Sequence, residues 1–236
     1  MQSPILITGV ARSGTSMVAG VVSLSGAFGG NMRGPSINNQ KGMFENAAIV
    51  GEIIKPYYRS LGVDPMGQFP LADITDMHIP INWKSRVTDI MVRQGYKEGQ
   101  WFYKCPKMCQ HWPVWHYAFP DAKWIIVRRK TPDIINSCMR TGFMTAFSKA
   151  TNRQAVGVTN EYDGWMWWVH QHEERFREMI TEGLNCKQVW PERMVDGNYS
   201  QMKEMLEWLG LEPNLTKIME FIEPKLWKAR TKQKIV

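Results

Sequence analysis

A turn bounded by two glycines near the N-terminus is the first part of the sequence whose residues could do chemistry. The apolar run Ile5–Ile7 predicts a strand, the turn extends from Gly9 to Gly14, and Thr15–Val18 predict the opening of a helix. A strand, a loop and a helix in this order can form a phosphate cradle, because free backbone N–H groups and the helix dipole attract an anion. The spacing of the two glycines is that of a Walker phosphate-binding loop.

The positive charge of this loop is not in the Walker position. Ser16 occupies the hydroxyl position, but Thr15 stands where the Walker lysine would be, and Arg12 lies inside the loop instead. An arginine and two hydroxyls in such a turn predict phosphate binding, although glycine-rich turns also occur without ligands. The candidate contacts in the loop are Arg12, Ser13, Gly14, Thr15 and Ser16.

A second candidate anion site follows a later strand. Arg129 leaves the apolar run KWIIV, and Ser137 lies eight residues further on, in a predicted helix. An arginine can bind a phosphate with two parallel hydrogen bonds, and a serine adds a neutral donor. The alternative is a surface arginine and a helix serine that never meet. Two anion sites on one sheet would suit a ligand with phosphates at both ends.

Other residues that could bind a ligand or a metal form weaker patterns. Cys105 and Cys109 are four residues apart, but no further pair of cysteines or histidines completes a zinc set, so no metal site is predicted. His170 and His172 are two apart on a predicted helix and cannot share a face. Histidines and tryptophans more often occupy surface or core positions than bind a ligand. This applies to His111, His116, His170, His172, Trp165, Trp167 and Trp168.

Composition indicates one globular domain over residues 1–236. The chain is 44% hydrophobic and 11% aromatic, which is enough for one buried core. The net charge of +7 fits an anionic partner or ordinary surface lysines equally well. The sequence contains no signal peptide pattern and no apolar stretch that could span a membrane. Four cysteines without a paired framework favour reduced thiols and a cytoplasmic protein.

The elements that must position these residues alternate between strands and helices. The predicted strands are Ile5–Ile7, Trp101–Lys104, Lys123–Val127 and Cys186–Trp190. The predicted helices begin at Thr15 and near Pro132 (with Thr131 as N-cap), or span Phe44–Lys55, Asn82–Gln94, Gln110–Phe119, Asn160–Glu182 and Gln201–Leu209. Residues 26–43, 56–81 and 141–158 are predicted to be irregular. This alternation predicts an α/β fold of three layers, in which helices flank a central parallel sheet and ligands bind at the carboxyl ends of the strands.

The motifs together resemble the PAPS-dependent sulfotransferase family, where PAPS is 3′-phosphoadenosine 5′-phosphosulfate. The resemblance rests on VARSGTS, YKCPK, FPDAKWIIVRR with Arg129 and Ser137, NQKGMFEN and WPERMVDGNYSQMKEMLEWLGL, in an order that covers residues 4 to about 211. It implies a P-loop-like sulfotransferase fold similar to bacterial members. It also implies that the first loop holds the 5′-phosphosulfate and that Arg129 and Ser137 hold the 3′-phosphate.

The resemblance also suggests catalytic roles. Arg12 occupies the position where the family places a Lys or Arg near the bridging oxygen of the leaving phosphate, and no metal is needed. Cytosolic members use a histidine as base in the motif that corresponds to YKCPK, but this sequence has Cys105 and Pro106 there. Glu45 is therefore the candidate base. Its alternative role is to interact with a helix dipole or to pair with Arg12 or Lys41.

Lys104 and the C-terminal tail are further candidates with open alternatives. Lys104 could contact the sulfuryl group, or it could be a surface or structural lysine. The family closes a basic C-terminal segment over the nucleotide, which could involve Trp227, Lys228 and Arg230. The family's RKG pattern is missing here, so a solvated tail is the preferred interpretation.

The predicted reaction is in-line transfer of a sulfuryl group from PAPS to a hydroxyl or amine of a small-molecule, carbohydrate or lipid acceptor. A P-loop nucleotide or small-molecule kinase is the alternative enzyme, but the Walker lysine is missing and no obvious Mg²⁺-binding aspartate follows an apolar strand. A non-catalytic nucleotide-binding module is the second alternative. No motif of a known nucleic-acid-binding module is present, so nucleic acid is not a predicted partner.

Overall fold

A four-stranded parallel sheet forms the centre of the protein. The computed structural model describes residues 1–37 and 39–228. The strand order is β2-β1-β3-β4, so β1 lies between β2 and β3. All neighbouring strands are parallel, and Ile7 is paired with Lys104 on one side and with Ile125 on the other. The four predicted strands are confirmed as β1 (Ile5–Gly9), β2 (Phe102–Lys104), β3 (Lys123–Val127) and β4 (Cys186–Val189).

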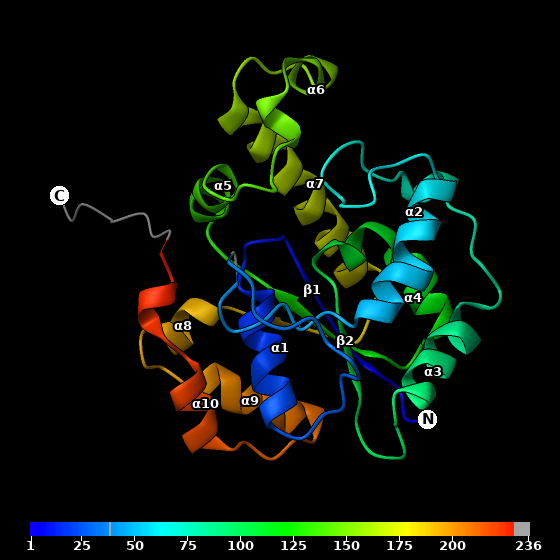
Figure 1. Ribbon diagram of the computed structural model, residues 1–236, viewed down its shortest axis with the longest axis vertical. Helices are drawn as coiled ribbons and strands as arrows, with labels where there is room; N and C mark the ends of the chain where they lie inside the picture. Colours follow the sequence, from blue (N-terminus) through cyan, green and yellow to red (C-terminus); the bar gives the residue numbers. More distant parts are fainter. Residues whose placement is uncertain (38, 229–236) are drawn as a thin grey trace.

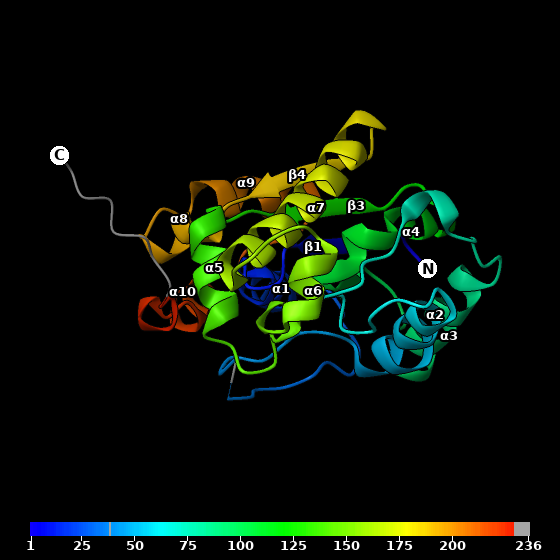
Figure 2. The same ribbon diagram turned by 90° about the horizontal axis from the view of Figure 1, so that it is seen from above.

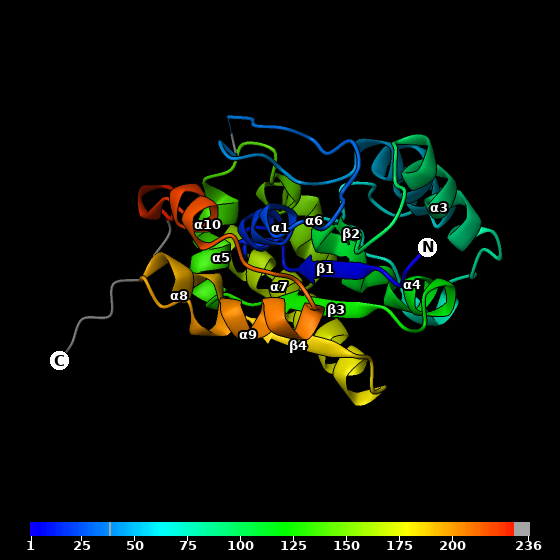
Figure 3. The same cartoon turned by 90° about the horizontal axis from the view of Figure 1, so that it is seen from below.

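Helices cover both faces of this sheet, which gives the predicted three layers (Figures 1, 2 and 3). Successive side chains of β1 point to opposite faces, so Ile5 and Ile7 belong to one hydrophobic cluster and Leu6 to the other. Both faces of a parallel sheet must be buried, and the near-continuous apolar run of β1 meets that need. The cluster around Ile5 and Ile7 contains residues of α1 (Thr15–Leu24), α8 (Pro191–Val195), α9 (Ser200–Leu209) and α10 (Leu215–Phe221). The cluster around Leu6 contains residues of α2 (Lys55–Ser60), α3 (Trp83–Arg93), α4 (Trp112–Ala118), α5 (Thr131–Met139) and α7 (Glu161–Thr181).

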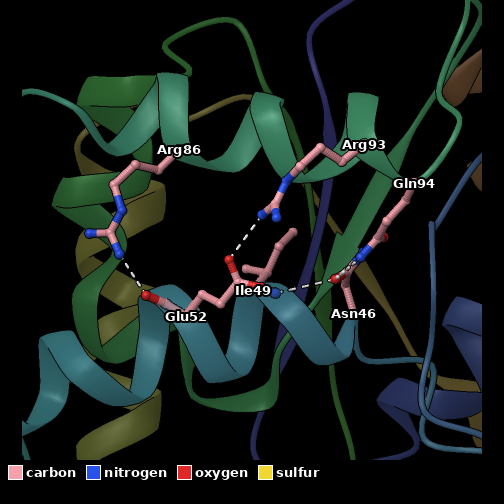
Figure 4. A network of polar contacts seen from close by, with 6 residues as sticks. All are labelled: Asn46, Ile49, Glu52, Arg86, Arg93 and Gln94. Carbon is pink, nitrogen blue, oxygen red and sulfur yellow. Dashed lines mark hydrogen bonds and ion pairs between the residues drawn. The ribbon is translucent and has the colours of Figure 1, made fainter.

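The helix predicted over Phe44–Lys55 begins later and ends later than the pattern suggested. Its central part, Ile49–Ile54, is a π-helix, and the chain continues without a break into α2. Pro56 has no N–H to offer the carbonyl of Glu52 four residues earlier, and the Arg86 side chain of α3 donates to that carbonyl instead (Figure 4). The prediction that residues 56–81 are wholly irregular is therefore wrong for residues 56–60 and for the 3₁₀ turn Ile74–Asp76.

Short helices account for most of the other differences. Within residues 141–158, which were predicted to be irregular, Ala146–Ser148 form a 3₁₀ turn and Ala150–Ala155 form α6. The helices α8 and α10 were not predicted either, because elements of five to seven residues show too little periodicity. Thr131 is the first residue of α5 rather than its N-cap, and Lys130 takes the cap position. No helix in the described part of the chain is both long and apolar enough to cross a membrane.

Candidate active site

The loop between β1 and α1 places its backbone at the carboxyl end of the central strand. Arg12 and Gly14 have positive φ angles of 73° and 98°, so the chain reverses sharply before α1 begins at Thr15. A side chain at Gly14 would bring its Cβ within 2.9 Å of the Trp227 ring, so glycine is required for both space and conformation. No side chain caps α1, and Met17 is the first residue of the helix whose N–H bonds back to Gly14, which leaves the amides of Thr15 and Ser16 for a ligand.

Ser13 is the exception among the predicted loop contacts. Its side chain is fully buried, and its backbone N–H donates to the Val10 carbonyl at 3.0 Å. Within the described residues, its hydroxyl has no hydrogen-bond partner, and it lines neither of the two cavities described below. Ser13 thus lies behind the loop rather than on its open side.

Arg12 joins the two predicted anion sites into one. Its Nε donates to Ser137 Oγ at 3.1 Å, and its carbonyl accepts from Arg129 Nη1 at 2.8 Å. The pairing of β1 with β3 explains this meeting, because the residues that follow both strands emerge side by side. Burial lowers the pKa of Arg129 to about 10 and also lowers the pKa of Arg12. Arg129 therefore stays charged at neutral pH, which favours binding of an anion.

A cavity of about 360 Å³ lies over this arrangement, and we call it the first cavity. Its wall contains the loop, Arg129 and Ser137, together with residues from the C-terminal segment. The Trp227 ring lies 4.1 Å from the Arg129 guanidinium carbon, as in a cation–π contact. Trp227 and Lys228 both line the cavity, and the preferred interpretation of a solvated tail is wrong for Trp227, which is partly buried, whereas Lys228 is exposed. Arg230 lies outside the described residues.

A second cavity of about 180 Å³ opens beside the first. The two cavities share Arg12, Thr15, Ser16 and Asn39 in their walls, so they meet at the loop. Asn39 was not singled out in the sequence, yet its amide donates to Ser16 Oγ at 2.8 Å. No local pattern marks this asparagine, because the contact joins an irregular segment to α1.

Glu45 and Lys104 form an ion pair in the wall of the second cavity. Their Oε1 and Nζ atoms are 3.0 Å apart, and Lys104 also donates to the Met43 carbonyl at 2.9 Å. Lys104 is only 3% exposed, so the alternative of a surface lysine is wrong. The predicted alternative partners of Glu45 were Arg12 and Lys41, but Lys41 pairs with Glu223.

Asn46, the residue after Glu45, holds the chain in position at Glu45. Asn46 is buried and donates to Gln94 Oε1 at 2.6 Å and to the Gly29 carbonyl at 3.1 Å. Asn46 Oδ1 in turn accepts from the Ile49 N–H at 3.2 Å, at the start of the helical segment (Figure 4). Glu45 is therefore held between a fixed helix start and Lys104, rather than lying in the first turn of a helix as predicted.

The cavity wall also contains residues that the sequence placed among core candidates. His172 and Trp168 of α7 line the second cavity, although both are almost fully buried. His172 Nδ1 lies 2.8 Å from the Trp168 carbonyl, which can only accept, so the ring proton is on Nδ1. Its Nε2 is then an acceptor without a partner among the described residues. Burial lowers the pKa of His172 to about 4.

In the described part of the chain, neither the cysteines nor a cluster of metal-ligating side chains forms a second reactive site. All four cysteines are free thiols. Burial raises the pKa of Cys105, the residue that stands in the YKCPK motif, so a thiol rather than a thiolate is present at neutral pH. No group of three or more His, Cys, Asp or Glu side chains among the described residues is arranged to hold a metal ion.

Comparison with known proteins identifies the family. The profile described as "Sulfotransferase family" matches residues 4–215. The chain belongs to the sulfotransferase family. A comparison with curated protein sequences finds no significant match.

A solved sulfotransferase structure agrees with this chain at the level of the fold. The sulfotransferase STF1 from Mycobacterium tuberculosis is similar with a TM-score of 0.51 and 14% sequence identity, over 93% of this chain and 71% of that protein. The sulfotransferase STF9 from Mycobacterium avium gives a TM-score of 0.49 and 17% identity, over 94% and 67% of the two chains. The three-layer α/β sulfotransferase fold expected from the sequence is thereby confirmed.

Proposed function

We propose that this sulfotransferase moves a sulfuryl group from PAPS to a hydroxyl or amine of a small-molecule, carbohydrate or lipid acceptor. The observation that carries the proposal is the meeting of two cavities at Arg12, Thr15 and Ser16. A donor in the first cavity and an acceptor in the second would face each other across this loop. Family membership supports the transfer of a sulfuryl group, and the cavities suggest where each substrate binds.

The first cavity has the chemistry that PAPS requires. Uncapped amides at the start of α1 and the Thr15 and Ser16 hydroxyls suit the 5′-phosphosulfate, which supplies the transferable sulfuryl group. Arg129 and Ser137 suit the 3′-phosphate, because a buried guanidinium and a hydroxyl can each donate a hydrogen bond to phosphate oxygens. The Trp227 ring lines the cavity next to Arg129. Ser13 is left out of the proposed contacts, since its side chain faces the interior.

Transfer would proceed in line, with Glu45 as base. The bond from sulfur to the leaving phosphate oxygen breaks as the bond to the acceptor oxygen or nitrogen forms, and the acceptor proton goes to the Glu45 carboxylate. Arg12 would stabilise charge on the leaving oxygen without a metal. Lys104 uses two of its three N–H groups on Glu45 and the Met43 carbonyl, so the third could contact the sulfuryl group.

Two measurements test the donor and the reaction. First, 3′,5′-adenosine bisphosphate should raise the melting temperature more than ATP with Mg²⁺ does, because only it carries both phosphates in the proposed places. The reverse order would favour the kinase alternative. Second, labelled PAPS should transfer its label to some member of a panel of sugars, lipids, phenols and peptides. Nucleotide binding without any transfer would favour a non-catalytic module.

We further propose that residues 1–236 act as one domain and that the protein works in the cytoplasm. The two hydrophobic clusters cover opposite faces of the same sheet, which supports one folding unit. Four free cysteines are compatible with a reducing compartment. Limited proteolysis and localisation of a tagged protein would test these two statements.

A further inference from the structure

The second cavity has more positive charge than the proposed transfer uses. Among the described residues, five Lys and Arg side chains line it, against the single carboxylate of Glu45. Two of the five already have side-chain hydrogen-bond or ion-pair partners, because Arg12 donates to Ser137 and Lys104 pairs with Glu45. The other three cationic residues are Arg33, Lys55 and Lys107.

The donor does not account for these three charges. Arg33, Lys55 and Lys107 line only the second cavity, whereas the phosphates of the donor belong to the first. In the part of the chain that the structure describes, no carboxylate forms an ion pair with any of them. Like charges that face one small space repel each other unless an anion lies between them.

The three side chains come from separate segments whose backbones are anchored. The Arg33 N–H donates to the Glu45 carbonyl at 2.8 Å, so this arginine is tied to the proposed base. Lys55 is the first residue of α2. The Lys107 ammonium donates to the Pro65 carbonyl and lies 5.2 Å from the centre of the Tyr58 ring. Their convergence on one cavity follows from these anchored segments, although the Arg33 side chain itself is exposed.

A second observation points to a ligand in the same place. His172 lines this cavity, and its buried Nε2 is an acceptor without a partner within the described residues. An acceptor atom that is buried without a partner costs free energy, and a ligand hydroxyl or amine would remove that cost. The cavity thus offers cationic groups for an anion and a neutral acceptor for a donor group.

We propose that the acceptor substrate carries an anionic group, such as a carboxylate, sulfate or phosphate ester, besides the hydroxyl or amine that receives the sulfuryl group. Lys55, Lys107 and Arg33 bind the anion, and His172 Nε2 accepts a hydrogen bond from a donor group of the same molecule. This inference rests on the proposed function, because it takes the second cavity as the acceptor site.

Matched pairs of probes that differ only in charge test the proposal. One pair is 4-nitrophenyl glucuronide and 4-nitrophenyl glucoside, and the other is 4-hydroxyphenylacetate and 4-hydroxyphenylacetamide. The two pairs distinguish an acidic sugar from an aromatic acid. Binding to the full chain with 3′,5′-adenosine bisphosphate present is measured by calorimetry or ligand-observed NMR. Turnover with PAPS is measured separately.

In at least one pair, the acid should bind about tenfold more tightly than its neutral partner, because a charged hydrogen bond is worth at least that factor. The preference should fall by about the same factor in a Lys55→Gln, Lys107→Gln double variant, and also at high salt. Arg33→Gln, at an exposed position, provides a second variant if the double variant folds poorly. Lys97→Gln changes an exposed lysine outside both cavities and should leave the preference unchanged.

Equal binding of acid and neutral probes would overturn the proposal, as would a preference that survives in the variants or a lack of binding by both acids. The binding measurement needs no turnover, so the two proposals can fail separately. A charge preference that depends on Lys55 and Lys107, without transfer from PAPS, would support the anion site and contradict the proposed reaction. Transfer to neutral acceptors alone would support the proposed reaction and contradict the anion site.

Discussion

The two cavities that meet at Arg12 are built in different ways. The first depends on the turns after two adjacent strands, β1 and β3, and on the helices that follow them, and the C-terminal segment completes its wall. The second collects residues from the irregular segments, from the end of β2 and from the middle of α7. Its ion pair joins Glu45 to Lys104, which are 59 residues apart.

The position of the first cavity is set by the topology of the sheet, whereas the second cavity is set by the tertiary packing of separate segments. Adjacent parallel strands bring their carboxyl ends together whatever the loops contain, so an anion site there is set by the sheet. The wall of the second cavity can change without disturbing the sheet, since it depends on loops. In a transferase this arrangement would keep the donor site constant and leave the acceptor site free to vary. Substitutions on the two sides should therefore have separable effects.

The largest effect is expected at the shared residue. Arg12→Ala should lower kcat by about 10³, because it removes the cation at the leaving oxygen. The dissociation constant of 3′,5′-adenosine bisphosphate should change by less than about tenfold, since Arg129 and the loop amides remain. Arg12→Lys is the matched control, because it keeps the charge at the same positive φ and should retain more activity. Equal losses in kcat and in binding would make Arg12 a binding residue only.

Glu45→Gln should have the next largest effect and should be confined to the acceptor side. Loss of the base is expected to lower kcat by about 10² or more, with unchanged binding of 3′,5′-adenosine bisphosphate. Glu52→Gln is the matched control, because Glu52 also forms an ion pair, with Arg93, but lies outside both cavities (Figure 4). Normal turnover by Glu45→Gln would show that another group takes the acceptor proton.

The donor side was largely predictable from the sequence. Apolar runs indicated all four strands, and the parallel order followed from the alternation with helices. The family resemblance implied that Arg129 and Ser137 share one phosphate, whereas their spacing alone left open whether they meet. The structure adds that Arg12 lies between the two sites. What the sequence missed here was the Gly14 and Trp227 contact, which joins segments 213 residues apart in a chain of 236.

The acceptor side was predictable only in its residue types. Glu45 and Lys104 were candidates, but their pairing depends on how the segment before the π-helix packs over β2, and no local pattern encodes that. Asn39, Lys55 and His172 were not separable from ordinary surface or core residues. Side chains that meet through irregular segments have no periodicity to reveal them.

Trp227 offers a smaller effect that belongs to the donor side alone. Trp227→Leu should weaken binding of 3′,5′-adenosine bisphosphate by about tenfold, because it removes a desolvated cation–π contact with Arg129 and a wall of the first cavity. The KM of the acceptor should stay the same. Trp208→Leu is the control, since Trp208 contacts Lys123 and Lys187 away from both cavities. A larger change in acceptor KM than in nucleotide binding would contradict the separation of the two sides.

Stability in acid should also change, because two histidines in the core, His111 and His172, are buried. Trp115 Nε1 donates to His111 Nε2 at 3.0 Å, so His111 carries its proton on Nδ1, next to Tyr58, whose hydroxyl donates to the Lys107 carbonyl. Burial lowers the pKa of His111 to about 3, and a proton on Nε2 would break the bond from Trp115. His172 behaves in the same way, with a pKa lowered to about 4.

Because the unfolded chain protonates histidine near pH 6.5, it binds more protons than the folded chain between that pH and the lowered pKa values. Stability should therefore fall as pH drops below about 6.5, by about 1.4 kcal/mol per pH unit for each histidine. Urea unfolding at pH 7 and pH 5 checks this. His172→Gln should make the difference between the two free energies about 2 kcal/mol smaller. His170→Gln, at an exposed position on the same helix, should leave it as in the wild type, and an equal change in both variants would show that burial is not the cause.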